Sequence, residues 1–249
     1  MRRPLPLSSL RRWLALVILC GFGLQLFFVA RIVSMRFIDP ESTAFQRSEL
    51  VRVVRKSDAL TWRQDWVARS LHPNAIKRAV IASEDDIFAS HGGVQWDALE
   101  KAWNKNAKAQ ARAEARAQAK ASSAKSVKVV GGSTITQQLA KNVFLSGERT
   151  LLRKGQELIL TLVIEHTLSK QRILEIYLNS VEWGEGVFGV EAAAQHYFRH
   201  PAHQLNPWEC ARLAVMLPRP KYYEKFPHSP YLAGRAQTIL ARMPQVELP

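Results

Sequence analysis

The sequence predicts an all-α body that follows a single N-terminal membrane helix. Three observations lead to this fold class: a long apolar run near the N-terminus, a succession of segments that begin with helix-capping residues, and a scarcity of segments whose apolar residues alternate with a period of two. The chain has 249 residues, 47% of them hydrophobic, with 12 glycines and 12 prolines, which is typical of a packed protein.

The first predicted element is a membrane-spanning helix over residues 13–33. It is built on the apolar run Trp13–Ala30, which is interrupted only by Gln25 and would rise about 27 Å as a helix. This run is longer than the apolar region of a signal peptide, and Phe28 is too bulky for a cleavage site ending at Ala30. We therefore expect an uncleaved anchor.

The charges around this run predict its orientation. Four arginines precede it, whereas the two that follow it lie close to acidic residues. Under the positive-inside rule, residues 1–12 form a basic tail in the cytoplasm, and everything after the span lies outside it. We expect a membrane-proximal linker over 34–60 and a helical body over 61–249.

The formal net charge of +14 is unevenly distributed along the chain. Residues 1–36 contain basic groups and no acidic ones, and a second basic segment, rich in alanine, lies at about 104–128. The rest of the chain is nearly neutral, which argues against nucleic-acid binding. The segment 104–128 lacks an apolar face, so we interpret it as a solvated insertion in the body; the alternative is that it attracts anionic lipid.

The body reads as consecutive helices. Leu151–Leu168 is apolar almost all round, which predicts a helix buried at the centre of the body. Other helix starts are indicated by Asn74, by Thr134 with Gln137 at capping-box spacing, by Ser169, and by Pro207 for a helix through Val215. Without the anchor and the insertion, one domain of roughly 185 residues remains, which is large enough to bury about 70% of its unfolded surface.

Three groups of residues are candidates for chemistry. Glu84 and Asp85 follow an apolar helix, where burial raises the pKa of a carboxyl group, although adjacent acids at a helix end are more often solvated. The segment 131–138 (GGSTITQQ) can present backbone N–H groups to an anion, or it is an ordinary capped helix start. Lys141 lies one turn beyond Gln137 on the same helical face.

The third group is a basic cluster around a glutamate. Arg149, Arg153 and Lys154 precede Glu157, and Arg153 and Glu157 are four residues apart on one helical face. Arginine pairs with phosphate through two parallel hydrogen bonds, so the cluster suits a phosphate-bearing ligand; a surface ion pair is the simpler interpretation.

Other formal motifs carry less weight. Residues 184–189 match G-x-G-x-x-G but follow a predicted helix and not a strand, and Ser122 with Lys125 matches S-x-x-K without its companion motifs. Cys20 and Cys210 are predicted to be unpaired. The remaining candidates lack zinc-site spacing: Glu165, His166, His196 and His200.

Four segments in this order resemble the successive motifs of the family-51 peptidoglycan glycosyltransferases: ASEDDIFASHGG, GGSTITQQLAKN, RKGQE and KQRILEIYLN. The resemblance extends from about residue 60 to the end, excluding the insertion, and the single anchor is similar to that of the family's monofunctional members. It implies a lysozyme-like helical fold with a smaller membrane-facing lobe. The implied activity is polymerisation of lipid II into β-1,4 glycan strands, with release of undecaprenyl pyrophosphate.

The resemblance also implies roles for individual residues. Glu84 matches the catalytic general base and Glu157 the second essential glutamate. Basic and polar residues are implied to bind substrate: Lys141, Arg149, Arg153, Lys154, Ser133 and Gln137. Tyr177 and Asn179 match a mainly structural motif. A divalent cation, Mg²⁺ or Mn²⁺, is compatible with Glu157 as its protein ligand through the donor's pyrophosphate. The sequence departs from the family at the insertion and at Gln156, where some relatives carry a basic residue.

The partners implied are lipid II, the growing glycan strand, membrane lipids and other proteins of cell-wall synthesis or division, with no nucleic acid. The implied location is the bacterial inner membrane, with the catalytic domain in the periplasm. Two alternatives stay open: a lytic muramidase that uses Glu84 as an acid, and a non-enzymatic membrane-tethered partner. Basic residues near Glu157 favour synthesis, because a departing pyrophosphate requires cations rather than an acid.

Overall fold

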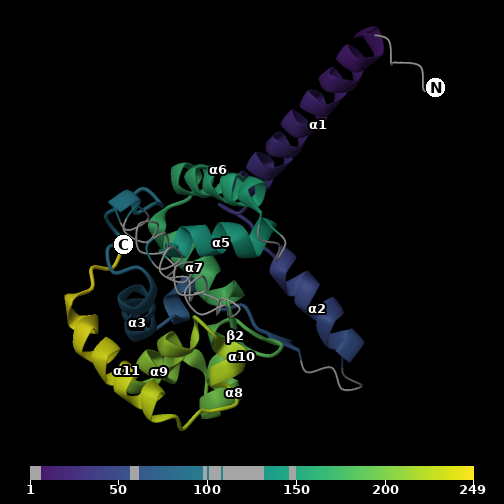
Figure 1. The fold of residues 1–249 in the computed structure, drawn as a ribbon. Coiled ribbons are helices and arrows are strands. Elements are labelled where there is room, and N and C mark those ends of the chain that lie inside the picture. Colours follow the sequence, from purple (N-terminus) through teal and green to yellow (C-terminus); the bar gives the residue numbers. More distant parts are fainter. Residues whose placement is uncertain (1–6, 57–61, 98–99, 101–107, 109–131, 146–149) are drawn as a thin grey trace, which may run out of the picture.

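Helix α1 (Leu7–Ser34) projects from a helical body, and the other elements fold against one another at its C-terminal end (Figure 1). The structure is a computed structural model, and it describes residues 7–56, 62–97, 100, 108, 132–145 and 150–249. Almost all of the predicted insertion, 104–128, lies outside the described residues. The all-α fold class is confirmed.

The described part of the body contains helices of up to 17 residues and three very short strands. The α-helices after α1 are α2 (Ala44–Lys56), α3 (Asn74–Glu84), α5 (Ile135–Phe144), α6 (Leu151–Thr167), α7 (Lys170–Ser180), α8 (Val190–Phe198), α9 (Pro207–Met216), α10 (Pro220–Tyr223) and α11 (Pro230–Arg242). The 3-10 helices are η1 (Arg69–Leu71), η2 (Ala202–Gln204) and η3 (Met243–Gln245). The strands are β1 (Arg63–Gln64), β2 (Glu182–Gly184) and β3 (Val187–Phe188).

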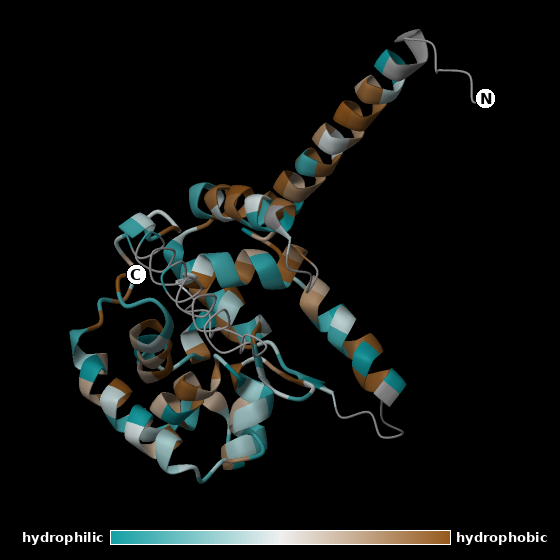
Figure 2. Cartoon of the chain, viewed as in Figure 1, coloured by the Kyte–Doolittle hydropathy of each residue, from teal (hydrophilic) through white to brown (hydrophobic). Residues whose placement is uncertain are grey.

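Helix α1 is long and apolar enough to cross a membrane over Arg11–Ser34. Its apolar side chains are exposed along most of its length, and Figure 2 shows the brown helix standing clear of the body. Gln25, the polar residue within this run, pairs with Gln156 of α6: each side-chain amide donates to the other's oxygen, over 2.8 and 3.0 Å. The predicted span therefore forms a helix that also contacts the body.

Two groups of packed helices form the core. Helix α3 packs against α9 and α11, while α5 packs against α6, α7 and α2. Except for α2, each of these helices contributes its apolar face to one buried cluster, which includes Ile81, Leu139, Ile164, Ile173 and Leu213. The candidates Glu84, Ser133 and Lys141 lie where α3 of the first group meets α5 of the second.

The strands form a small sheet in the order β1-β3-β2. Strand β1 pairs in parallel with β3, and β2 pairs with β3 antiparallel. The predicted G-x-G-x-x-G segment forms this β2–β3 hairpin, and its last glycine, Gly189, precedes α8. Gly184, the first glycine of this segment, ends β2, so the expectation that the segment follows a helix and not a strand is wrong. Because β2 turns back into the antiparallel β3 and does not lead directly into a helix, the segment still lacks the strand–turn–helix arrangement of a dinucleotide site.

The prediction that Leu151–Leu168 is buried at the centre of the body is wrong. Helix α6 lies at the surface beside the base of α1 (Figure 1). One face, with Leu160 and Ile164, packs on the core, whereas Leu152 is 88% exposed and Ile159 and Leu162 are about half exposed. The apolar residues of α6 are interrupted by Arg153, Lys154 and Glu157, and an apolar outer face beside a candidate membrane span is compatible with lipid as well as with protein as its neighbour.

The predicted helix starts are confirmed except one. Thr134 and Gln137 form a reciprocal capping box, Ser169 accepts a hydrogen bond from the Arg172 N–H, and Pro207 opens α9. Asn74 is wrong as a cap: Pro73 occupies that position and its carbonyl accepts the first helical bonds, so Asn74 is already helical.

The membrane-proximal segment contains a helix. Helix α2 occupies much of the predicted linker 34–60, and its Glu49 pairs with Lys221 of α10 over 2.5 Å. Arg52 of α2 also pairs with Glu185, which follows β2. These ion pairs and the buried Val53 hold α2 against the body.

Candidate active site

Glu84 ends α3 at the wall of a cleft. The helix forms because apolar residues spaced by three and four positions, including Ile76, Ala79 and Val80, bury one face. It stops at Asp85, whose backbone turns away at φ −165° and ψ 73°. This turn separates two adjacent carboxylates that the sequence alone could not tell apart.

Asp85 faces the interior and fixes the local structure. Its oxygens accept hydrogen bonds from His91 Nε2 over 2.8 Å, Gln95 Nε2 over 2.6 Å and the backbone N–H of Ile135 over 3.0 Å. The last contact joins the end of α3 to the beginning of α5. Asp85 is therefore a positioning residue that the sequence reasoning did not identify as such; the nearby His91 was the available signal.

The beginning of α5 contributes the opposite wall. The Thr134 hydroxyl donates to the carbonyl of Gly93 over 2.6 Å, which ties the capping box to the loop after α3. Gln137 is buried, and its side-chain oxygen accepts from the Thr134 N–H, so Gln137 caps the helix and does not line the cleft. Gln138 lines the cleft in its place.

The cleft is a cavity of about 500 Å³. Its lining residues are Ser83, Glu84, Gln95, Gly132, Ser133, Thr134, Gln138, Lys141, Leu217 and Pro218. Three predicted site residues, Glu84, Ser133 and Lys141, thus meet in one cavity. Arg149 lies outside the described residues.

The surroundings of Glu84 act in opposite directions on its ionisation. Burial raises the pKa of Glu84, whereas hydrogen bonds from Gln138 Nε2, over 2.8 Å, and Ser83 Oγ, over 3.4 Å, lower it. Asp85 raises the pKa and Lys141 lowers it. The result is a carboxyl group whose pKa lies above its ordinary value, as a base that works near neutral pH requires.

The predicted basic cluster forms on α6. Glu157 is buried, and it pairs with Arg153 Nη1 over 3.1 Å and with the Lys154 ammonium. These three side chains are not among those that line the Glu84 cavity. Glu84 and Glu157 therefore belong to one site, as predicted, only if a residue between them connects the cavity with the α6 cluster.

Lys141 lies between the two glutamates. Its ammonium is attracted by both Glu157 and Glu84, and it is repelled by Arg153 and Lys154. Desolvation within the cleft is the largest effect, and the pKa of Lys141 is lowered overall. Lys141 lines the cavity that contains Glu84, and its charge also interacts with the Arg153, Lys154 and Glu157 cluster on α6, so it links the two groups electrostatically.

The residues of the fourth motif support the site from behind. The Tyr177 hydroxyl donates to Gln138 Oε1 over 3.0 Å. Burial raises the pKa of Tyr177 well above its ordinary value, so this hydroxyl keeps its proton. Asn179 exchanges hydrogen bonds with the backbone of Val67 over 2.9 and 3.0 Å. Both residues hold the fold, as the sequence indicated.

The side chains offer little for a resident metal ion. Within the described part of the chain, His, Cys, Asp and Glu do not gather in groups of three or more that could hold one. Both oxygens of Glu157 are engaged by Arg153 and Lys154. A divalent cation near Glu157 would need oxygen ligands from the substrate. Cys20 and Cys210 are both free, as predicted.

The site combines a carboxylate at the wall of a cleft, a capped helix start opposite it and a lysine in the same cavity, an arrangement that suits acid–base catalysis. A profile of the transglycosylase family matches residues 52–244. The chain belongs to the transglycosylase family and is a glycosyltransferase.

Relatives from several bacteria resemble almost the whole chain. A protein of Burkholderia thailandensis described as a biosynthetic peptidoglycan transglycosylase is 50% identical over 242 residues, which cover 96% of this chain and 88% of the relative. Proteins with the same description from Herminiimonas arsenicoxydans and Bordetella pertussis are 47% and 46% identical, covering 98% and 90% of this chain and 99% and 88% of theirs.

Proposed function

We propose that this enzyme polymerises lipid II into β-1,4 glycan strands of peptidoglycan and releases undecaprenyl pyrophosphate. The family match and the relatives described as biosynthetic peptidoglycan transglycosylases support peptidoglycan as the product. The observation that carries the mechanism is the placement of Lys141 between the carboxylate of Glu84 and the ion-paired Glu157.

In the proposed reaction, the 4-hydroxyl of the acceptor's N-acetylglucosamine attacks C1 of the donor's N-acetylmuramic acid, with inversion from α to β. The new bond forms between this oxygen and C1, while the bond from C1 to the pyrophosphate oxygen breaks. A sugar hydroxyl is a weak nucleophile, so ionised Glu84 accepts its proton as the bond forms. General bases of this kind contribute on the order of 10²–10⁴ in rate.

The departing pyrophosphate is a stable anion and needs positive charge. Lys141 in the cleft and the Arg153–Lys154 pair on α6 supply it, with Arg149 as a further proposed contact; Ser133 lines the same cavity. Mg²⁺ or Mn²⁺, when bound by the pyrophosphate beside Glu157, would neutralise further charge. Because Gln137 is committed to the capping box, its role is to hold the α5 start in place.

The decisive experiment replaces the proposed base. Full-length protein in non-ionic detergent is incubated with labelled lipid II, with and without Mg²⁺, and glycan products are separated on a gel. We expect Glu84→Gln to abolish polymerisation while the melting temperature changes little. The matched control is Asp86→Asn, which makes the same carboxyl-to-amide change two residues away at an exposed position.

Other results would identify the alternatives. Degradation of purified glycan strands in the absence of lipid II would indicate a muramidase. Unchanged polymer formation by Glu84→Gln would contradict the general-base role and support a non-enzymatic or differently catalysed function. Equal yields with and without added metal after chelation would remove the divalent cation from the proposal.

We further propose that α1 anchors the enzyme in the bacterial inner membrane, with residues 1–12 in the cytoplasm and the catalytic domain in the periplasm. The length and hydropathy of Arg11–Ser34 support a single span, and the arginines before it support this orientation. Lipid II, the growing strand and membrane lipids are then its immediate partners, together with other proteins of cell-wall synthesis or division.

A further inference from the structure

A second cavity, of about 920 Å³, lies where the chain leaves α1. It is bounded by the segment after α1, by η1, by α3 and by the junction of α6 with α7. The residues that matter in its lining are Arg36, Phe37, Arg69, Lys77, His166 and Arg172. The cavity shares no lining residue with the active-site cleft.

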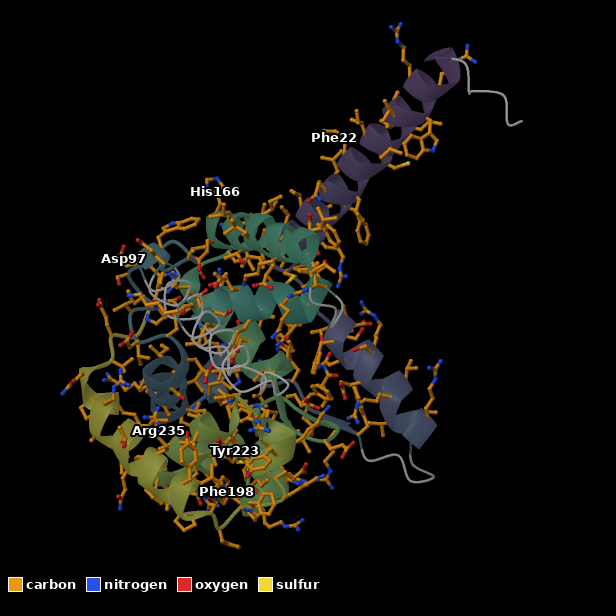
Figure 3. All side chains as sticks on the ribbon, viewed as in Figure 1. Phe22, Asp97, His166, Phe198, Tyr223 and Arg235 are labelled. Carbon is orange, nitrogen blue, oxygen red and sulfur yellow. The ribbon has the colours of Figure 1, made fainter. Side chains whose placement is uncertain are left out.

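The position of this cavity relates it to the membrane surface. The candidate span ends at Ser34, and Arg36 and Phe37 follow within three residues. Phe37 is 80% exposed and Ile38 is 66% exposed, although both are large apolar side chains. Figure 3 shows His166 on the same side of the body as α1, with Arg235 at the far end. If α1 spans the bilayer, as proposed above, the cavity opens at headgroup level.

One cation of the cavity is fully committed to the protein. Arg172 pairs with Asp39 over 2.6 Å and with Glu175 over 2.9 Å, and its Nε donates to the carbonyl of Met35 over 2.8 Å. Asp39 and Glu175, the acidic residues of the lining, are thus both paired with Arg172. The same bonds hold the segment after α1 in place. Arg172 therefore shapes the cavity and is not available to a ligand.

Three other cations have no such partner. Arg36, Arg69 and Lys77 form no ion pair within 4.0 Å with any carboxylate of the described chain. Among the described residues, the guanidinium of Arg69 donates only to the neutral Gln171, over 2.7 Å, and the Lys77 ammonium donates to the neutral Asn74, over 3.3 Å. Desolvation and the nearby Arg69 lower the pKa of Lys77, and only Glu175 opposes them. The cavity thus holds surplus positive charge that an anion would stabilise.

We propose that this cavity binds the phosphate of an anionic phospholipid headgroup. Arginine and lysine together match a phosphate in charge and hydrogen-bonding capacity, and Phe37 and Ile38 adjoin the site as apolar contacts for the acyl chains. A lipid is favoured over a free anion because apolar and basic groups lie side by side directly after a candidate span. The proposal rests on membrane anchoring and is independent of the chemistry at Glu84.

The test measures lipid retention by the full-length protein. Protein in non-ionic detergent is titrated with phosphatidylglycerol, with phosphatidylcholine and with inorganic phosphate, and bound lipid is counted by native mass spectrometry. We expect Arg69→Gln/Lys77→Gln to weaken phosphatidylglycerol binding roughly 30-fold, since each basic group at a membrane surface contributes a factor of about five. Phosphatidylcholine binding should be weak in both proteins.

The matched control is Lys225→Gln/Arg235→Gln, which removes the same charge at exposed positions outside the cavity. We expect it to bind phosphatidylglycerol as the wild type does. Segment 104–128 is intact in every protein, so any lipid that it attracts is common to all. Equal losses in the two double variants would show general charge attraction and overturn the proposal. Displacement of the lipid by equimolar inorganic phosphate would assign the cavity to free phosphate instead.

A further measurement separates this proposal from the proposed function. Arg69→Gln/Lys77→Gln is assayed for lipid II polymerisation in detergent without added phospholipid, where we expect the wild-type rate. Loss of polymerisation with unchanged phosphatidylglycerol binding would contradict the independence of the two sites. Inactive wild-type protein that still binds phosphatidylglycerol selectively would leave the lipid site intact and refute only the polymerase.

Discussion

Gln138 and Glu84 are joined by a hydrogen bond of 2.8 Å from the side-chain amide nitrogen of one to the carboxylate of the other. The orientation of this amide is not free, because its oxygen accepts the Tyr177 hydroxyl proton over 3.0 Å. Three helices, α3, α5 and α7, therefore meet at the proposed base. An ionised Glu84 can only accept hydrogen bonds, so the amide nitrogen of Gln138 faces it, and the amide oxygen is left to accept from Tyr177, which keeps its proton.

The first prediction concerns the pH dependence of polymerisation. Burial already raises the pKa of Glu84, and the Gln138 hydrogen bond lowers it. Gln138→Leu removes that bond, so the pKa of Glu84 rises further, and the base is lost at a higher pH. The acidic limb of kcat/KM for lipid II should move to higher pH.

Tyr177→Phe provides a graded comparison. It leaves Gln138 in place but removes the group that orients its amide, so the limb should move in the same direction by a smaller amount. An acidic limb at the wild-type pH in both variants would show that Glu84 ionisation does not control the rate.

The second prediction compares the structural roles of Asp85 and Asp86, the two aspartates of the first motif. Asp85→Ala leaves the donors of His91, Gln95 and Ile135 without their acceptor in the interior. We expect a loss of about 3 kcal/mol or more in unfolding free energy, measured by thermal or chemical denaturation in detergent. Asp86→Ala removes only an exposed pair with Arg242 and should cost less than about 1 kcal/mol. Similar losses would contradict the assignment.

The third prediction follows from Glu182 of β2. Burial raises its pKa to about 7 from an ordinary value of 4.5, although Lys221 lies 3.1 Å away and opposes the shift. A carboxyl group whose folded pKa is raised contributes stability that is complete below pH 4.5 and is lost as pH rises through 7. A glutamine at position 182 cannot ionise, so the Glu182→Gln variant does not lose this stability as pH rises.

Relative to wild type, Glu182→Gln should gain stability between pH 5 and pH 8, by up to about 3 kcal/mol. Melting temperatures across this range check the gain, with the exposed Glu247→Gln as control. A constant difference between variant and wild type would show that Glu182 is ionised throughout.

The fourth prediction concerns the loop that supports Thr134. Gly93 has φ +87°, and a Cβ there would lie 2.5 Å from Glu165 Cγ and 3.0 Å from Thr161 Cγ2. Gly93→Ala should destabilise the protein by about 2 kcal/mol or more, and reduce polymerisation as the α5 start shifts. Gly92→Ala, whose Cβ would meet nothing within 4 Å, is the matched control. Equal melting temperatures would contradict the expectation.

Local rules predicted much of this structure from the sequence. Capping residues at Thr134 and Ser169 set helix starts correctly, because caps depend on neighbours three residues away. Asn74 failed because the preceding proline was already suited to the position. The apolar run of α6 was read correctly as a helix but wrongly as central, since periodicity does not distinguish protein from lipid as the covering material.

Three of the predicted site residues lie together, whereas the contacts among the site residues were not predicted. Glu84, Ser133 and Lys141 meet in one cavity, as the motifs indicated. The sequence could not predict that Gln138, and not Gln137, lines the cleft. The two adjacent glutamines differ only in the direction in which their side chains leave the helix. The selection of Glu84 over Asp85 for the cleft also depends on a backbone turn that no spacing rule encodes.

The amide pair between Gln25 and Gln156 has a consequence for how the enzyme is mounted. Gln25 lies nine residues before the end of α1, about 13 Å along the helix axis. If this part of α1 lies in hydrocarbon, as proposed, little water is present to compete for the two amide hydrogen bonds. The pair would then hold α6 at a fixed position along α1. These two side chains would then fix how deeply the body sits relative to the proposed membrane. A replacement anchor without Gln25 would still attach the protein to the membrane but would not fix this depth.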